Sequence, residues 1–372
     1  MIFGSRVRQA REVRGLTQTE LAAAIGVAQP YVAAVESGAK PASRVFVARL
    51  AAATSFPESF FAEPSVEIAP GSLLFRARAS MTSRQERQVR RYGELLFEAT
   101  QRLMTDLQPI PVRIGNLSPD AVTPEKAARL VRSAFGYAPD EPATALLRRA
   151  ENHGVFVMSV PMATSAHEAF STWAGEVPDL RPLIVLFDTT APDRLRFNIA
   201  HEIGHLVLHK AYRDRPRVLE DEANLFASTL LLPEVAMRRE FQPPLTLTQL
   251  VRLKVRWGVS MQALARRAWQ LQIVTDRQYR QLCIQISARG WRTSEPAADR
   301  IPMERPRTLA KMAEVLYGMP VDHRALAKRL HWEPLLVREL LARQGTAAPQ
   351  TGALVADVLP MRSRSAPDAL AE

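Results

Sequence analysis

Two kinds of hydrophobic pattern follow one another in the middle of the chain. Short apolar runs rich in β-branched residues at 155–160 and 182–187, with a similar run at 170–173 between them, predict three strands. Residues 196–208 are then mostly apolar without an internal proline, and 219–233 place apolar residues at helical spacing up to a terminal proline. A small sheet followed by two helices predicts an α+β domain within a mainly helical chain.

The N-terminal part shows three short helical patterns, at 6–14, 18–25 and 29–36. Thr17 and Glu20 are spaced as a capping box for the second of them. A glycine turn separates this helix from the third, which carries a proline in its tolerated first turn. Two short helices joined in this way predict a helix-turn-helix, whose second helix can lie in the DNA major groove.

The rest of the chain is predominantly helical. Residues 81–107 predict a long helix, and we expect its arginines to lie on a solvated face rather than on DNA. Shorter helical patterns occur at 124–134, 143–152, 309–317, 321–330 and 334–342, and 69–79 has the character of an extended segment.

These patterns divide the chain into five parts. We expect a five-helix helix-turn-helix domain at 1–65, a helical linker at 66–109, an α+β domain at 110–275, a helical module of unknown role at 276–344 and a disordered tail at 345–372.

Composition narrows the class of protein. The 372 residues carry a net charge of +11, and residues 1–62 contribute seven basic against four acidic side chains, a net of +3. Such a balance attracts polyanions such as DNA, although an arginine-rich codon usage would explain part of it.

No run approaches 18 apolar residues, so we expect a cytoplasmic protein without a membrane span. The single Cys283 excludes an internal disulfide and a cysteine-based zinc site.

The sequence His201-Glu202-x-x-His205 lies inside the predicted apolar helix. Residues four apart share a helix face, so the two imidazoles can bind one Zn²⁺. The intervening Glu202 can then reach a metal-bound water as general base. An ordinary core helix with two histidines is the alternative. Gly204, on the far side of the helix, permits close packing of a neighbour.

A tetrahedral zinc site needs a third protein ligand, and the next helix begins with Glu220, Asp221 and Glu222. The pattern Glu-x-x-Ala-Asn favours Glu220, while Glu222 points about 200° away around the helix and is the second candidate. Carboxylates at a helix start also occur without any metal, because the helix dipole favours them. His209 lies about 12 Å along the axis from His201 and is too far for the same ion.

Three side chains are candidates for contacts with double-stranded DNA. Gln29 and Tyr31 lie at the start of the predicted recognition helix, where contact with base edges is easiest, and Gln18 can reach a phosphate or a base. A small helical domain used only for dimerisation is the alternative interpretation.

The motifs resemble two known families. The segment 193–209, the acidic helix up to Pro233 and the segment 253–268 are similar to the ImmA/IrrE family of zinc metallopeptidases, over roughly 110–275. The segments Leu16-Thr-Gln-x-Glu-Leu21 and Val35-Glu-Ser-Gly38 resemble the Xre family of DNA-binding domains.

The resemblance implies a zincin-like fold, Zn²⁺ held by His201, His205 and a downstream glutamate, and water activation by Glu202. It also implies a transcriptional repressor as the protein substrate, a role in a mobile-element or stress response, and a possible homodimer on palindromic DNA. His167 or Tyr212 could polarise the substrate carbonyl, and the outer strand could hold an extended peptide.

Two functions therefore compete. One is a DNA-binding regulator with a working zinc endopeptidase, which cleaves a repressor or itself. The other is a transcriptional regulator or antitoxin-like protein whose metallopeptidase-like domain only senses or binds a partner. The intact Glu202 favours the first, because metal binding alone does not need a carboxylate at that position.

Overall fold

The computed structural model describes residues 2–68, 81–115, 117, 122–163, 169–176, 179–188, 191–209 and 216–345. Four features predicted from the sequence lie outside these residues: the extended segment at 69–79, His167, Tyr212 and all but the first residue of the tail. The described part is mainly helical with one small sheet, so the predicted fold class is confirmed.

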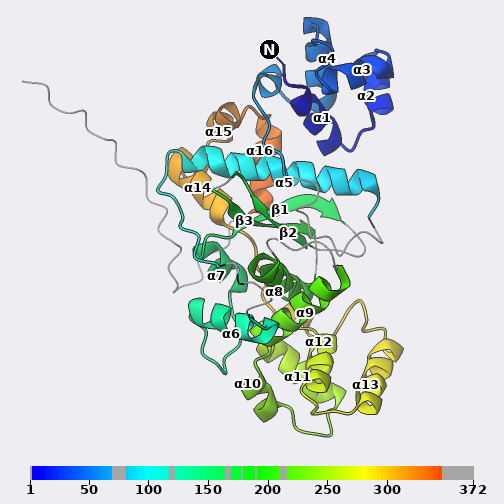
Figure 1. The fold of residues 1–372 in the computed structure, drawn as a ribbon, viewed down its shortest axis with the longest axis vertical. Helices are drawn as coiled ribbons and strands as arrows, with labels where there is room; N and C mark the ends of the chain where they lie inside the picture. The colour runs from blue at the N-terminus through cyan, green and yellow to red at the C-terminus, as the bar shows by residue number, and fades with distance from the viewer. Residues whose placement is uncertain are drawn as a thin grey trace, which may run out of the picture.

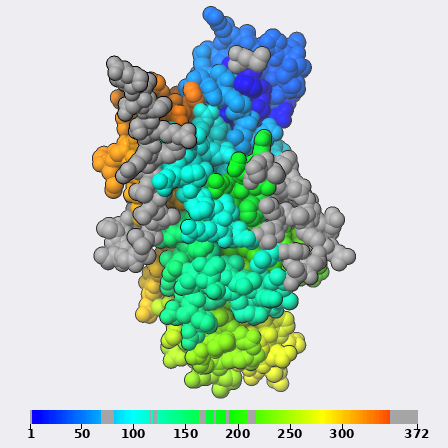
Figure 2. All heavy atoms as spheres, turned by 60° about the vertical axis from the view of Figure 1, so that its left-hand side comes forward, coloured from blue at the N-terminus to red at the C-terminus, as the bar shows by residue number. Residues whose placement is uncertain are grey.

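A bundle of five short helices forms one end of the elongated molecule, and α11–α13 form the other (Figures 1 and 2). The bundle consists of α1 (Gly4–Val13), α2 (Gln18–Ile25), α3 (Gln29–Glu36), α4 (Arg44–Thr54) and the 3-10 helix η1 (Glu58–Ala62). Thr17 and Glu20 form the predicted capping box at the start of α2, and Gly26 ends this helix with a positive φ of 66°. The predicted helix-turn-helix is therefore present.

Helix α5 (Ser83–Met104) runs between this bundle and the sheet (Figure 1). It packs against α1 on one side and β1 on the other. Arg84 and Arg87 are exposed, as expected for a solvated face, but Arg91 is buried, so the expectation was wrong for this residue. Arg91 is buried because it forms ion pairs with Glu12 of α1 and Glu94 of α5.

The sheet contains the three predicted strands in the order β1-β3-β2. Strand β1 (Phe156–Ala163) is parallel to β3 (Arg181–Asp188), and β2 (Ala169–Ala174) pairs antiparallel with the other edge of β3. Alternate residues face opposite cores, since Val185 packs with α5 while Ile184 belongs to the core around α8. The sheet thus separates the N-terminal bundle and α5 from the core around the helix that carries the HExxH motif.

The second core surrounds α8 (Pro192–Leu208) and α9 (Pro216–Leu231), which pack against each other. Its other helices are α6 (Pro124–Ala134), α7 (Leu146–Asn152), α10 (Glu234–Glu240), α11 (Leu247–Trp257), α12 (Met261–Gln270) and α13 (Asp276–Ala288). The sequence predicted a helical module from residue 276 onwards, but no individual helix at the position of α13. Its polar surface leaves only Leu282 and Ile286 buried, a weak hydrophobic signal.

The last three helices are α14 (Thr308–Tyr317), α15 (His323–Leu330) and α16 (Pro334–Arg343). They return to the first core, where α14 packs against α5 and α16 against β1. The short 3-10 helix η4 (Ala298–Arg300) lies in the connection before them. None of the helices described is long and apolar enough to cross a membrane. The boundaries proposed for the five parts of the chain remain a prediction.

Candidate metal centre

The HExxH motif lies on α8, at the point where this helix crosses α9. A side chain on Gly204 would bring its Cβ to 3.0 Å from Cδ1 of Phe226 and 3.3 Å from Cα of Ala223. The absence of a side chain at position 204 thus permits this close approach of the two helices, as the sequence suggested. This approach places the histidines of α8 beside the carboxylates of α9.

His201, His205 and Glu220 converge on one point. Their ligand atoms all lie within 4.8 Å of one another. The two Nε2 atoms are 3.0 Å apart. Oε2 of Glu220 lies 3.4 Å from Nε2 of His201, and Oε1 of Glu220 lies 3.4 Å from Nε2 of His205. Both histidines are buried, and the side chain of Glu220 is 19% exposed.

Neighbouring side chains orient both imidazoles. Nδ1 of His201 donates to Oδ1 of Asn224 at 3.1 Å, which leaves a lone pair on Nε2. Nδ1 of His205 faces Nδ1 of His209 at 2.9 Å, and Nε2 of His209 lies 2.9 Å from Oε2 of Glu222. If His209 donates to this carboxylate, it accepts from His205, and Nε2 of His205 also keeps its lone pair.

The two candidate glutamates of α9 thus have different contacts. Glu220 lies beside His201 and His205, whereas Glu222 lies beside His209. This separation follows from their positions around the helix, about 200° apart. The structure places Glu220, and not Glu222, among the converging groups.

The surroundings of His205 and Glu220 favour the protonation states that bind a metal ion. Burial lowers the pKa of His205 to about 4, so its imidazole is neutral near pH 7. Burial alone would raise the pKa of Glu220, but the contacts with His201 and His205 outweigh burial and hold that pKa well below the usual range. A carboxylate and two neutral imidazoles are the protonation states in which these groups bind a cation.

The donor set fits zinc. Ligands about 2.0–2.1 Å from a tetrahedral ion are separated from one another by roughly 3.3–3.4 Å. The two Nε2 atoms are 3.0 Å apart, and each lies 3.4 Å from one oxygen of Glu220, His201 from Oε2 and His205 from Oε1, so the separations are near this value. Two nitrogens and one carboxylate oxygen also form a donor set typical of catalytic zinc, which leaves a fourth position for water.

Glu202 lies on the same helix, and its contacts are different. Its Oε2 accepts a 2.6 Å hydrogen bond from Oγ of Ser171, which is fully buried on β2. Burial raises the pKa of Glu202 to about 7, although His201 and Ser171 oppose this rise. A carboxyl group with a pKa near neutrality is suited to accept and return a proton. Sequence reasoning missed Ser171, because nothing local indicates that β2 packs on α8.

The candidate DNA-binding residues lie together at the start of α2 and α3. Nε2 of Gln29 donates to Oε1 of Gln18 at 2.9 Å, and Nε2 of Gln18 donates to Glu36 at 2.8 Å. Tyr31 is partly buried: its ring packs edge-on against Phe46, and its hydroxyl donates to the backbone oxygen of Pro41 at 3.3 Å. The two glutamines thus form a hydrogen-bonded pair, while Tyr31 also has a structural role.

A helix-turn-helix bundle and a HExxH helix beneath a small sheet together define a DNA-binding module joined to a metallopeptidase-like domain. The comparisons with protein families agree. Residues 2–60 match a helix-turn-helix domain, and residues 150–268 match the IrrE N-terminal-like domain of peptidase family M78. The chain is therefore a helix-turn-helix domain fused to an ImmA/IrrE-type domain, which confirms the resemblance seen in the sequence. No curated protein matches the chain.

Proposed function

We propose that this protein is a DNA-binding transcriptional regulator that carries a working zinc endopeptidase. Its substrate is a repressor or another regulatory protein, cleaved in a stress or mobile-element response. The observation that supports this most strongly is the convergence of His201, His205 and Glu220, with Glu202 buried on the same helix.

Each group has a distinct role in this proposal. His201, His205 and Glu220 hold the zinc, which supplies a Lewis acid that lowers the pKa of a water and polarises a peptide carbonyl. Glu202 accepts a proton from the attacking water and returns it to the leaving amine. Ser171 holds the carboxylate of Glu202 in place. Asn224 and His209 fix the rings of the two histidines, as the outer contacts of metal-binding histidines commonly do.

The sheet provides a place for an extended substrate. Strand β2 is an edge strand of the sheet within the described residues, and it carries Ser171. A peptide that pairs with this edge would place its backbone near Glu202. The helix-turn-helix brings the enzyme to double-stranded DNA, with Gln18 and Gln29 as contact residues. Two copies bind a palindromic site as a homodimer.

Cleavage of a protein substrate tests the proposal. Wild-type protein and Glu202→Gln are incubated with the repressors encoded beside its gene, with and without a chelator. We expect zinc-dependent cleavage by the wild type and none by Glu202→Gln, while Asp299→Asn, a change of an exposed carboxylate elsewhere on the surface, keeps the activity. Neighbouring repressors that survive the zinc-loaded wild type would instead favour the regulator that senses a partner without proteolysis.

A further inference from the structure

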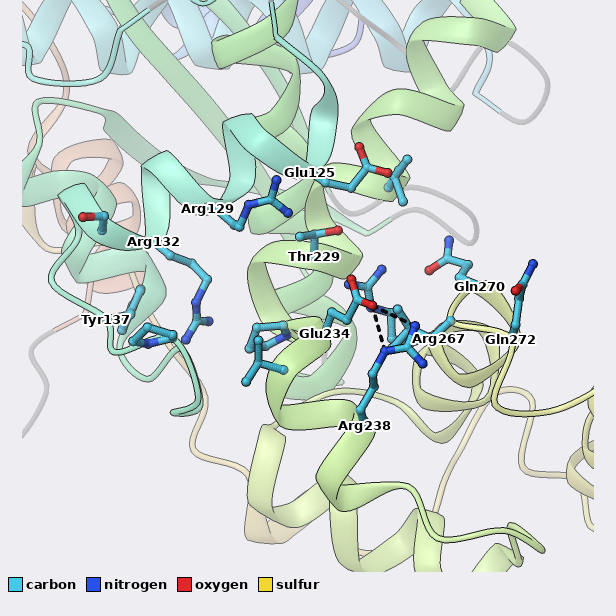
Figure 3. A pocket seen from close by; sticks show the side chains of 16 residues that line it. Glu125, Arg129, Arg132, Tyr137, Thr229, Glu234, Arg238, Arg267, Gln270 and Gln272 are labelled. Atoms are coloured by element: carbon cyan, nitrogen blue, oxygen red, sulfur yellow. Dashed lines mark hydrogen bonds and ion pairs between the residues drawn. The ribbon is translucent and has the colours of Figure 1, made fainter.

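A cavity lies beside α9, away from the residues of the metal centre, and Figure 3 shows the side chains that line it. Its volume is about 570 Å³, and helices α6, α9, α10 and α12 line it. Thr229 of its wall lies nine residues after Glu220, which is half a turn around the helix. The cavity is therefore separate from the proposed zinc site and needs its own explanation.

Positive charge predominates in the wall. Figure 3 shows Arg129 and Arg132 on one side and Arg238 and Arg267 on the other, with Thr229 between them. Two glutamates, Glu125 and Glu234, are the acidic members of the lining. Four arginines against two carboxylates leave an excess of two positive charges.

Arg267 is the most informative of these residues, because it is only 3% exposed. Its Nε donates to the backbone oxygen of Leu232 at 2.9 Å, and it forms no ion pair with any residue that the structure describes. The two terminal nitrogens of its guanidinium are thus available to a ligand. Burial lowers the pKa of Arg267 to about 10, although Glu234 and Glu125 oppose this fall.

Two further polar atoms in the wall are buried without a partner. They are Nε of Arg132 and Oγ1 of Thr229. The terminal nitrogens of Arg132 donate only to backbone oxygens, so no carboxylate of the described residues forms a direct ion pair with it. Buried polar groups are nearly always satisfied, and unsatisfied ones beside a cavity indicate a missing partner.

We propose that this cavity binds the phosphate group of a small organic molecule between Arg129 and Arg267. Arginine is suited to such groups, because its fork of N–H donors matches their oxygens. The cavity is much larger than one phosphate and falls in the range of small-molecule sites, about 300–1,000 Å³. The apolar side chains of Leu225, Val235 and Leu271 line the space that the uncharged body of the ligand occupies.

Calorimetric titration of the full-length protein tests this site at constant ionic strength. The probes are inorganic phosphate, AMP and adenosine. We expect phosphate to bind at millimolar concentration, and AMP to bind about tenfold more tightly than adenosine. Arg267→Lys keeps the charge but loses the fork, so it should weaken phosphate binding about tenfold.

A matched pair of variants locates the binding. Arg129 on α6 and Arg252 on α11 are both exposed, and only Arg129 lines the cavity. Arg129→Gln should weaken phosphate binding several-fold and Arg252→Gln should not, with melting curves confirming that every variant is folded. The proposal is overturned if phosphate does not bind, if Arg129→Gln and Arg252→Gln behave alike, or if adenosine binds as tightly as AMP. Because Arg129, Arg252 and Arg267 lie outside the proposed zinc site, their effects on phosphate binding do not depend on the outcome of the proteolysis experiment.

Discussion

The hydroxyl of Ser171 on β2 donates a 2.6 Å hydrogen bond to Glu202 on α8. A hydrogen bond to a charged group contributes about 1.5–3 kcal/mol, so its loss in Ser171→Ala should lower kcat roughly tenfold or more. The zinc content should stay that of the wild type, because Ser171 does not contact the converging histidines. Single-turnover cleavage and metal analysis of the same preparation measure both quantities. Unchanged kcat would show that Ser171 does not position the base.

Zinc binding distinguishes the two glutamates of α9. We expect about one zinc per chain in the wild type and none in His201→Ala or Glu220→Ala. Glu222→Ala removes a contact to His209 only, and such outer changes weaken metal affinity about 10–100-fold. Competitive titration with a chelator measures these affinities. Stoichiometric zinc in Glu220→Ala, or its complete loss in Glu222→Ala, would reverse the assignment.

The buried arginine of α5 should stabilise the fold strongly. Nε of Arg91 lies 2.7 Å from Glu12, and its NH1 lies 2.8 Å from Glu94. Arg91→Met leaves both carboxylates buried without this partner, which should reduce the free energy of unfolding by about 3–5 kcal/mol. Arg84→Met on the same helix removes an exposed pair with Glu20 and should leave the unfolding midpoint almost unchanged. Similar midpoints for the two variants in urea would contradict this.

Glu151 should make stability depend on pH. Burial raises its pKa from 4.5 to about 7, although the backbone N–H groups of Thr308 and Arg307 donate to its carboxylate and oppose this rise. The folded protein therefore holds a proton between these values that the unfolded chain releases. Wild-type stability should fall as the pH rises from about 5 to 8, by up to about 3 kcal/mol.

Glu151→Gln removes this dependence and keeps an oxygen that accepts both hydrogen bonds. Denaturant unfolding at several pH values gives the difference in unfolding free energy between wild type and variant. This difference should shift in favour of the variant with rising pH, and parallel profiles would argue against a raised pKa.

DNA contacts should depend on Gln29 more than on the hydroxyl of Tyr31. An operator is first selected from random double-stranded DNA. Gln29→Ala should then cost about 1–3 kcal/mol of binding, because an amide that reads a base edge is lost. Tyr31→Phe should bind almost as well, since its hydroxyl bonds within the protein to Pro41. A larger loss for Tyr31→Phe in fluorescence anisotropy would assign the base contact to Tyr31 instead.

The elements of this fold could be predicted where a local pattern determines them. The short apolar runs rich in β-branched residues at 155–160 and 182–187 predict strands, and the Thr17–Glu20 capping box marks the start of α2. Arg91 could not be predicted as buried, because its partner Glu12 lies 79 residues earlier in the chain. Local sequence shows that a side chain is charged but not which distant group will face it.

Some features of the candidate site could be predicted from the sequence and others could not, for the same reason. The four-residue spacing of His201 and His205 and the angular positions of Glu220 and Glu222 are properties of single helices, so the sequence indicates them. The contacts of Glu202 with Ser171 and of His209 with Glu222 join separate elements. Those contacts depend on how β2 and α9 pack against α8, which no single segment determines.

Gly204 shows how much of the site depends on one missing side chain. The histidines lie on α8 and Glu220 on α9, so the spacing of their ligand atoms depends on how closely these two helices pack. An added methyl at position 204 would lie 3.0 Å from the ring of Phe226, so the ring or the helix would have to shift by a few tenths of an ångström. A residue with no functional group of its own thus affects the distance between the histidines and the carboxylate of the centre. A substitution there could change metal binding and activity without altering any ligand or catalytic atom.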